Sequence, residues 1–222
     1  EMAEHLFLKK VKCPYCLQES KTQRVLSRHI RPLEVEKDGY TTYDGPNPYL
    51  YEPTVCGHCH LVFHDSFDKV RKHNREALET HYFNQVNPDV LKGDRTNEHV
   101  ILLYKFAVMT AQLSGQKPSV VAMLGMRIVW MYRLMGDTVS EKEWMQRTLD
   151  KYNEVQEAYT DPIRTGLPYD QLMLRIADLS AALDYYEDAR RWYGILLSSK
   201  EVSERIRNQA RTHWEDFRLE HT

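Results

Sequence analysis

Cys13-Pro14-Tyr15-Cys16 and Cys56-Gly57-His58-Cys59 together contain all four cysteines of the 222-residue chain. Two thiolates three residues apart on a tight turn can hold one metal ion from the same side, and a second pair completes a tetrahedron. Pro14 and Gly57 suit such turns, because proline fixes φ and glycine tolerates unusual backbone angles. The pattern therefore predicts one structural Zn²⁺ ion with four ligands, Cys13, Cys16, Cys56 and Cys59.

The surroundings of the two pairs add detail to this prediction. The 39 residues between the pairs exceed the roughly 15–20 of compact zinc sites of this type, so we expect a hairpin or loop inserted between two metal-binding turns. Four protein ligands leave no open coordination position, which argues against a catalytic zinc. Any one of three nearby histidines could replace a cysteine, but with four thiols present we expect them beside the site. These are His58, His60 and His64.

Both pairs also resemble redox motifs, CPYC that of glutaredoxins and CGHC that of protein disulfide isomerases. A redox pair opens a helix after a buried strand within a βαβ unit. The residues after the first pair, 17–22, have no apolar stripe at helical spacing. Structural zinc is therefore favoured, and thiol–disulfide exchange through Cys13/Cys16 or Cys56/Cys59 is kept as an alternative.

Composition restricts the class of protein. Hydrophobic residues make up 42% of the chain and charged residues 28%, which is typical of a globular protein. No apolar run approaches the roughly 18 residues of a membrane helix. Residues 1–12 contain no apolar stretch of signal-peptide length. We therefore expect a cytoplasmic protein that does not associate with membranes.

Residues 1–65 are expected to form a small zinc-binding module. Loose alternation of apolar residues predicts one or two short strands within residues 22–35, followed by a turn at Asp38-Gly39. The stretch Tyr40–Pro53 is rich in Tyr, Pro, Gly and Asn and predicts an ordered loop. Its tyrosines are expected to pack over the metal site, with a recognition loop as the alternative. Thr54-Val55 is expected to be a strand.

Residues 66–222 are expected to be all-helical. The pattern predicts six long helices joined by short connections, so that consecutive helices pack antiparallel. Capping boxes at Ser140–Glu143 and Ser198–Glu201 predict the start of two of them, and Asp170 that of another. The expected ranges are 99–113, 118–135, 140–159, 170–183, 186–197 and a last helix that includes 202–217.

The helical part also resembles a known repeat. Leu172–Leu197 resembles a tetratricopeptide repeat in its small and aromatic packing positions, and Met126–Pro162 is a second, less regular candidate. The expected fold class is thus α+β, mostly α. A small N-terminal four-cysteine, zinc-ribbon-like β module over residues 1–65 precedes an all-α, tetratricopeptide-like helical-repeat domain over residues 66–222.

With both parts considered, the chain resembles a bacterial family, domain-of-unknown-function family 2225, over nearly its full length. The resemblance rests on Lys10–Cys16, Asn47-Pro48 with Tyr51, Val55–Cys59 and, more weakly, Met131–Asp137 and Tyr186–Tyr193. It implies a zinc-ribbon module fused to tetratricopeptide-like helices and no enzymatic activity. One departure is that the family's second pair usually reads Cys-Pro-x-Cys-Gly, whereas Gly57 and His60 take the proline and glycine positions here.

The leading functional hypothesis is a non-enzymatic interaction scaffold. Zinc would replace the core that residues 1–65 are too short to build, and stacked helices would offer a surface to a protein or peptide partner. The chain has no Walker loop and no GxGxxG, HExxH or GxSxG motif, so we do not expect an enzyme.

Nucleic-acid binding through the zinc module is the other alternative. The segment Lys9–Arg31 holds seven basic residues and one acid, and nearby tyrosines could stack on bases. The same cations could instead offset the net charge of −2 on a zinc ion with four thiolates. The isoelectric point near 6.6 lies well below the roughly 9 of dedicated nucleic-acid-binding domains, so this alternative ranks second.

Overall fold

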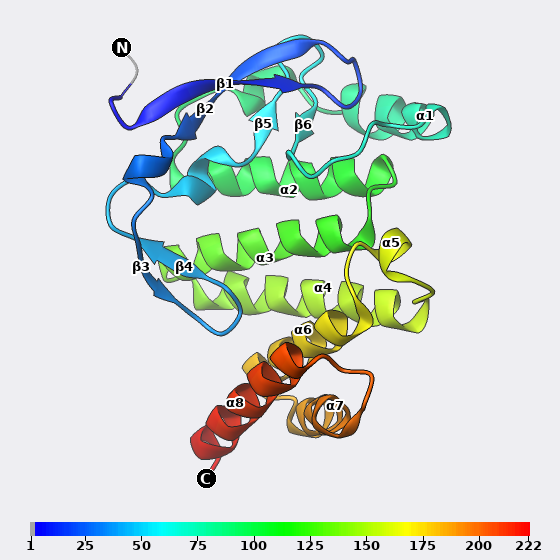
Figure 1. Ribbon diagram of the computed structural model, residues 1–222. Helices are drawn as coiled ribbons and strands as arrows, with labels where there is room; N and C mark the ends of the chain where they lie inside the picture. Colours follow the sequence, from blue (N-terminus) through cyan, green and yellow to red (C-terminus); the bar gives the residue numbers. More distant parts are fainter. Residues whose placement is uncertain (1–2) are drawn as a thin grey trace.

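The computed structural model describes residues 3–222. In this part of the chain, three small antiparallel sheets lie toward the N-terminal end and helices make up most of the remainder (Figure 1). The sheets pair β1 (Leu6–Lys12) with β2 (Glu19–Val25), β3 (Pro32–Val35) with β4 (Thr41–Tyr43), and β5 (Thr54–Val55) with β6 (Val62–Phe63). The predicted fold class, α+β and mostly α, is confirmed.

The strands explain the long gap between the cysteine pairs. The hairpin of β3 and β4 lies wholly within this gap, as the spacing predicted. Asp38-Gly39 lies in its turn, where Gly39 takes a φ of 93°. Strand β5 was predicted, whereas β1, which pairs in register with β2 from Leu6↔Val25 to Lys12↔Glu19, was not.

The six long predicted helices are present, together with two single turns. The first single turn, α1 (Arg75–Leu78), continues into a π-helical turn over Glu79–Phe83, and the second is α5 (Pro162–Thr165). The long helices are α2 (Asn97–Leu113), α3 (Pro118–Met135), α4 (Thr138–Glu157), α6 (Tyr169–Ala182), α7 (Tyr186–Ser198) and α8 (Glu204–Glu220).

Two predicted helix starts are wrong. Helix α4 begins before Ser140, because Gly136 ends α3 at a φ of 73° and Asp137 then accepts a hydrogen bond from the backbone N–H of Ser140. Helix α8 begins after the predicted box, because Ser198 is still part of α7 and Ser203 is the N-cap. In both cases another side-chain oxygen, that of Asp137 or of Ser203, caps the helix instead.

Asp170 was predicted to cap α6 and instead joins two helices. It lies within the first turn of α6, whose N-cap is Pro168. Its carboxylate accepts a hydrogen bond of 3.0 Å from the backbone N–H of Ser203, immediately before α8. The acid therefore holds the start of α8 against the start of α6.

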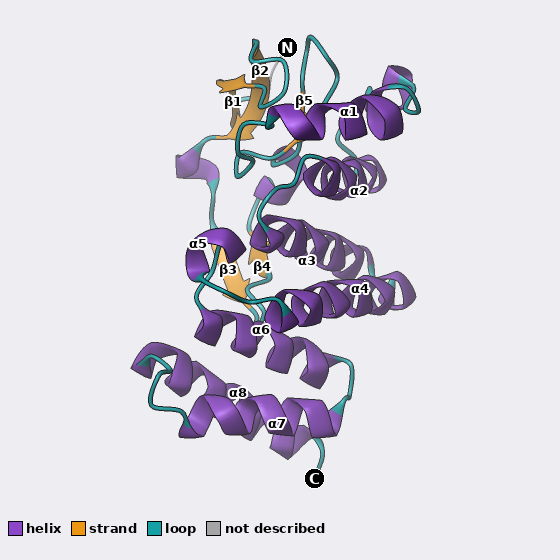
Figure 2. Ribbon diagram, turned by 90° about the vertical axis from the view of Figure 1, so that its right-hand side faces the viewer, coloured by secondary structure: helices purple, strands orange, loops and turns teal. Residues whose placement is uncertain are grey.

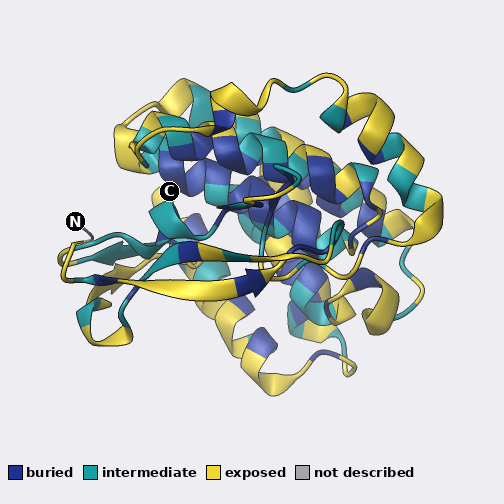
Figure 3. Ribbon diagram, turned by 90° about the horizontal axis from the view of Figure 1, so that it is seen from above, coloured by how far each residue is buried: buried dark blue, intermediate teal, exposed yellow. Residues whose placement is uncertain are grey.

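The helices pack in a definite order. Helices α2, α3 and α4 stack one on the next, α6 packs on α4, and α7 and α8 complete the C-terminal end (Figures 1 and 2). One hydrophobic core runs through the molecule, from Cys13 and Cys56 of the β hairpins to Phe217 of α8 (Figure 3). The predicted boundary between residues 65 and 66 remains a prediction.

Two tyrosines of the Tyr40–Pro53 segment pack on a helix instead of over the metal site, where they were predicted. The ring of Tyr49 lies 5.4 Å from that of Trp130 in α3, and the ring of Tyr40 lies 6.2 Å from it. These two tyrosines therefore cover helix α3, and the prediction that they cover the metal site is wrong for them. The segment is ordered as predicted, with β4 and a 3₁₀ turn at Pro48–Tyr51.

Within residues 3–222, no helix is both long enough and apolar enough to cross a bilayer.

Candidate metal centre and helical cleft

Each cysteine pair lies at the turn of a two-stranded sheet. Cys13 and Cys16 lie between β1 and β2, and Cys56 and Cys59 lie between β5 and β6. In the first turn, the N–H of Cys13 donates to the carbonyl of Gln18, and the equivalent bond in the second runs from Cys56 to Leu61. The two turns are thus built alike, although their sequences share only the cysteines.

Backbone N–H groups point at the first sulfur of each turn. Cys13 Sγ accepts from the N–H groups of Tyr15 at 3.4 Å and Cys16 at 3.5 Å, and Cys56 Sγ accepts from His58 at 3.4 Å and Cys59 at 3.5 Å. Such bonds stabilise a negatively charged sulfur. The turns therefore favour thiolates, the form in which cysteine binds metals.

The four sulfur atoms form one compact cluster. All of them lie within 4.8 Å of one another, and the Cys13–Cys59 and Cys16–Cys56 sulfur pairs are both 3.6 Å apart. A tetrahedral zinc ion with Zn–S bonds near 2.3 Å separates its sulfurs by about 3.8 Å. The four cysteines are free, and these distances are far from the roughly 2.05 Å of a disulfide. The donor set therefore fits one tetrahedral, thiophilic metal ion.

Protonation of the cluster follows from its hydrogen bonds. The hydrogen bond between the sulfurs of Cys13 and Cys59 is the largest cause that lowers the pKa of Cys13 below its ordinary value. The same bond raises the pKa of Cys59 above its ordinary value. The sulfur of Cys13 thus favours the thiolate form, and a metal ion bound between the sulfurs would take the place of the shared proton.

The residues after β6 brace the first turn. Arg75 of α1 donates to the carbonyl of Tyr15 at 3.0 Å, and its guanidinium lies 3.9 Å from the centre of the Tyr15 ring. The hydroxyl of Tyr82 donates to the carbonyl of His60 and accepts from the N–H of Val62, which braces the second turn. Both turns are therefore fixed to the same helical segment.

The three histidines lie outside the sulfur cluster. The ring of His58 contacts the carbonyl of Glu19 at 2.9 Å, and the ring of His64 bonds to Ser66 and to Glu52, each at 2.8 Å. The four sulfurs alone form the compact metal-ligand group that the described residues contain. The expectation that these histidines do not replace a cysteine ligand stays a prediction.

Part of the basic Lys9–Arg31 segment is already paired. Lys9 lies 2.8 Å and Arg24 3.2 Å from the carboxylate of Asp65, and Arg24 also donates to Thr54. Lys10 and Lys21 are directly opposite each other in the β1–β2 ribbon. Two of the seven cations thus hold the β hairpins together, and nucleic-acid binding by the remainder stays a prediction.

Comparison with known proteins identifies the family of this chain. A family described as an uncharacterized protein conserved in bacteria, DUF2225, matches residues 6–217. The chain belongs to this family. The resemblance read from the cysteine motifs is thereby confirmed. Neither the curated proteins nor the solved structures contain a match to the chain.

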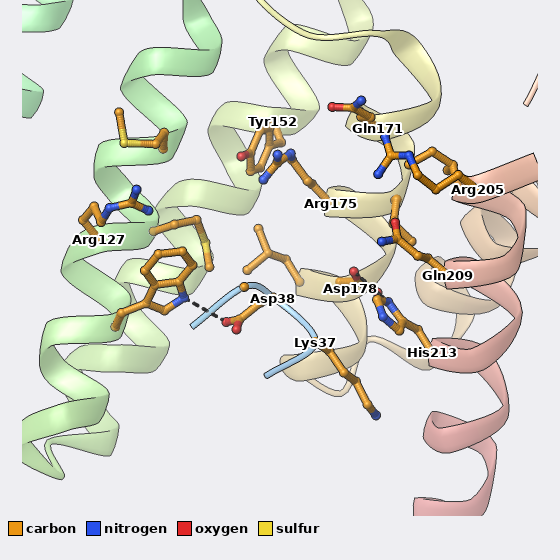
Figure 4. A pocket seen from close by; sticks show the side chains of 17 residues that line it. Lys37, Asp38, Arg127, Tyr152, Gln171, Arg175, Asp178, Arg205, Gln209 and His213 are labelled. Atoms are coloured by element: carbon orange, nitrogen blue, oxygen red, sulfur yellow. Dashed lines mark hydrogen bonds and ion pairs between the residues drawn. The ribbon is translucent and has the colours of Figure 1, made fainter. Parts of the chain in front are cut away.

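The helical part of this DUF2225 protein contains a cleft that the sequence did not predict. Its volume is about 430 Å³, and it lies between α3, α4, α6, α8 and the turn of the β3–β4 hairpin (Figure 4). The polar residues that line it are Lys37, Asp38, Arg127, Tyr152, Gln171, Arg175, Asp178, Arg205, Gln209 and His213. Apart from Tyr152, which is buried, the helix residues in this set lie at half-buried or exposed positions that any amphipathic helix offers to polar side chains, so the sequence carries no signal of a shared cleft.

Two residues that line this cleft, Asp178 and His213, belong to one hydrogen-bonded group. His213 Nδ1 lies 2.9 and 3.0 Å from the two carboxylate oxygens of Asp178, and the hydroxyl of Tyr193 donates to the same carboxylate. The carboxylate is thus fully used inside the protein. It fixes the orientation of the imidazole through Nδ1.

Proposed function

We propose that this DUF2225 protein is a zinc-stabilised interaction protein without catalytic activity of its own. One zinc ion on Cys13, Cys16, Cys56 and Cys59 would hold the β hairpins together. The observation that carries this proposal is the spacing of the four sulfurs on two matched turns. Four sulfur ligands at tetrahedral spacing suit zinc and leave no position for a substrate or water, which is the pattern of structural rather than catalytic sites.

The surroundings of the sulfurs also favour zinc over thiol–disulfide exchange. A redox CxxC pair lowers the pKa of its first cysteine at the N-terminus of a helix. Here each pair lies between two antiparallel strands. Each of the four sulfur atoms lies 3.6 Å from one sulfur atom of the other pair. A metal shared by both pairs uses this geometry, whereas two independent redox sites do not need it.

The helical part supports an interaction role through its packing order. Helix α3 packs on α4 and α6 packs on α7, so the chain forms two helical hairpins followed by α8. The first helix of each hairpin and α8 contribute most of the helical residues that line the cleft, and α4 adds Tyr152. Lining mainly by the first helices is the arrangement expected of tetratricopeptide-like repeats. A protein or peptide partner would bind in this cleft.

We place the protein in the cytoplasm, where reducing conditions keep the four thiols available for metal.

Cobalt substitution tests the structural role of the metal. Co²⁺ accepts the same tetrahedral sulfur site and, unlike Zn²⁺, absorbs visible light. We expect one Co²⁺ per chain with the intense visible bands of a tetrahedral thiolate site, unchanged by excess imidazole because no coordination position is open. Bands that shift with imidazole would show an open position and contradict a purely structural metal.

Two variants serve as controls in this experiment. Cys16→Ser removes one sulfur and should change the cobalt spectrum. His58→Ala should leave it unchanged, because the His58 ring contacts the carbonyl of Glu19 rather than the cluster.

A further inference from the structure

The cleft contains two arginines whose charge is not neutralised within the protein. Arg175 of α6 and Arg205 of α8 both line it and are both exposed (Figure 4). Among the carboxylates of residues 3–222, none lies within ion-pairing distance of either guanidinium. Unpaired arginines are common on convex surfaces, but here two of them line one concave space. Arg175 points toward Tyr152 of α4, and Arg205 points into the space between α6 and α8 (Figure 4).

The two acids that line this cleft are engaged by other side chains and lie outside ion-pairing distance of both arginines. Asp38 pairs with Arg133 at 2.9 Å and accepts from the indole of Trp130, and Asp178 is held by His213 and Tyr193. The third arginine, Arg127, is already bound to Glu52 at 2.9 Å. Lys37 also pairs, with Asp216 at 3.3 Å, so Arg175 and Arg205 are the cations of this cleft that have no carboxylate partner.

Amide side chains accompany both arginines. Gln171 precedes Arg175 by four residues on α6, and Gln209 follows Arg205 by four residues on α8, so each helix presents an arginine and a glutamine on one face. Figure 4 shows Gln171, Arg205 and Gln209 reaching into the space between the two helices. Guanidinium and amide groups together form a set rich in N–H donors, which suits a carboxylate.

A second, largely apolar lobe adjoins this cleft, which is called the first lobe below. It has a volume of about 480 Å³ and shares Lys37, Asp38, Asp178 and His213 with the first lobe. Its apolar lining includes Val35, Ala181, Ala182 and Phe217. Its further charged residues are paired, Glu36 with Arg133 at 2.6 Å and Glu220 with Lys37 at 3.8 Å. The two lobes together form a groove. The first lobe contains the unpaired Arg175 and Arg205, and the second is mainly apolar. Such a groove matches an extended peptide better than a compact small molecule.

We propose that this groove binds an acidic peptide segment of a partner protein. A carboxylate of the peptide would lie between Arg175 and Arg205, with hydrogen bonds from Gln171 and Gln209, and a neighbouring apolar side chain would occupy the second lobe. This inference rests on the proposed interaction function and adds the chemical class of the partner. Charge complementarity selects the acidic peptide, since basic or neutral segments leave both guanidiniums unpaired.

Selection from a peptide library tests the inference. The full-length, zinc-loaded protein is presented to a library of random hexapeptides, and the enriched sequences are compared with those from Arg175→Gln/Arg205→Gln. A matched control, Arg211→Gln/Arg218→Gln, removes two exposed arginines of α8 that do not line either lobe and so changes the net charge equally. Thermal unfolding of all three proteins shows that the substitutions leave the fold intact.

We expect the wild type and the control to enrich peptides with Asp or Glu beside an apolar residue. The affinity of the most enriched peptide, measured by fluorescence anisotropy, should fall about tenfold or more in Arg175→Gln/Arg205→Gln, because charge-assisted hydrogen bonds are lost. It should change little in the control.

Two results would overturn the inference, and they differ in what they say about the proposed function. Enrichment of neutral or basic peptides, or of acidic peptides regardless of Arg175 and Arg205, would leave an interaction protein with a different partner. If the wild type enriched no peptide at all, both the acidic partner and the interaction role of the cleft would be contradicted.

Discussion

The indole N–H of Trp130 donates to a carboxylate oxygen of Asp38 over 3.1 Å, and this bond joins the turn of the β3–β4 hairpin to helix α3. Arg133 reinforces the junction, since its guanidinium lies 2.9 Å from the same carboxylate. The hairpin begins and ends between the two cysteine pairs, yet its turn forms part of the helical cleft. The candidate metal centre and the cleft are thus connected through one short segment of chain.

Removal of this junction should loosen the hairpin. In Asp38→Ala, Arg133 loses a half-buried partner and Trp130 loses its acceptor, so we expect the free energy of unfolding to fall by about 2 kcal/mol. Amide hydrogen exchange in residues 32–43 should accelerate more than exchange in α6. Glu34→Ala, on the same hairpin but exposed, is the control and should change neither quantity. Equal effects of the two substitutions would show that the Asp38 contacts do not hold the hairpin.

Two glycines in helices should respond to alanine in opposite ways. A Cβ on Gly125 of α3 would lie 2.5 Å from the hydroxyl oxygen of Thr148 in α4, whereas a Cβ on Gly194 of α7 meets nothing within 4 Å. We expect Gly125→Ala to lower the free energy of unfolding by about 1–2 kcal/mol through overpacking. Gly194→Ala should raise it by up to about 0.8 kcal/mol through helix propensity. Chemical denaturation measures both, and a stabilised Gly125→Ala would contradict the close α3–α4 contact.

The two metal-binding turns contain strained backbone at equivalent positions. Leu17 and His60, each directly after the second cysteine of its pair, take φ values of 64° and 68°. Glycine adopts this conformation without cost, so we expect Leu17→Gly and His60→Gly each to stabilise the protein by roughly 0.5–1 kcal/mol. Leu17→Ala, which keeps a Cβ, is the control and should not stabilise. A melting temperature that falls in both glycine variants would contradict the strain.

The stability of the β–helix junction should depend on pH through Glu52. Burial alone would raise the pKa of this carboxyl, but hydrogen bonds from His64 and Arg127 outweigh burial and lower the pKa from its ordinary value of 4.5. A carboxyl with a lowered pKa in the folded state stabilises the protein above its unfolded pKa, and this contribution is lost as the pH falls through the folded pKa.

The measurement is urea denaturation of the wild type and Glu52→Gln at pH 7, 5 and 3.5. At pH 7 and 5 we expect the variant to be less stable by about 2 kcal/mol, and the difference should shrink at pH 3.5. Both proteins carry the same four cysteines, so loss of metal in acid affects them alike. A difference that stays constant or grows toward low pH would contradict the assignment.

Much of the fold could be read from the sequence because it depends on local patterns. Apolar periodicity and breaks at Gly115, Gly136 and Pro162 located the six long helices, and two CxxC pairs predicted one four-sulfur cluster. The errors at helix starts arose because several oxygens compete to cap one helix. At α4 the geometry after Gly136 selected Asp137 over Ser140, which a sequence pattern does not reveal.

Features that depend on distant packing were not predictable. Nothing in the Tyr40–Pro53 segment indicates that Tyr49 packs on Trp130, 81 positions later in the chain. The cleft shows the same limit, because Arg175 and Arg205 look like ordinary exposed residues until α6 and α8 are placed side by side. Residues that are distant in the sequence and meet only in the folded protein produce no periodic pattern in the sequence.

The metal content of the purified, untagged protein, determined together with a count of reactive thiols, tests the central claim most directly. We predict one zinc ion per chain and four thiols that react only after a chelator or denaturant is added, because all four sulfurs would be metal ligands. Protein that contains no zinc and holds Cys13–Cys16 or Cys56–Cys59 disulfides would contradict the account and favour the redox alternative.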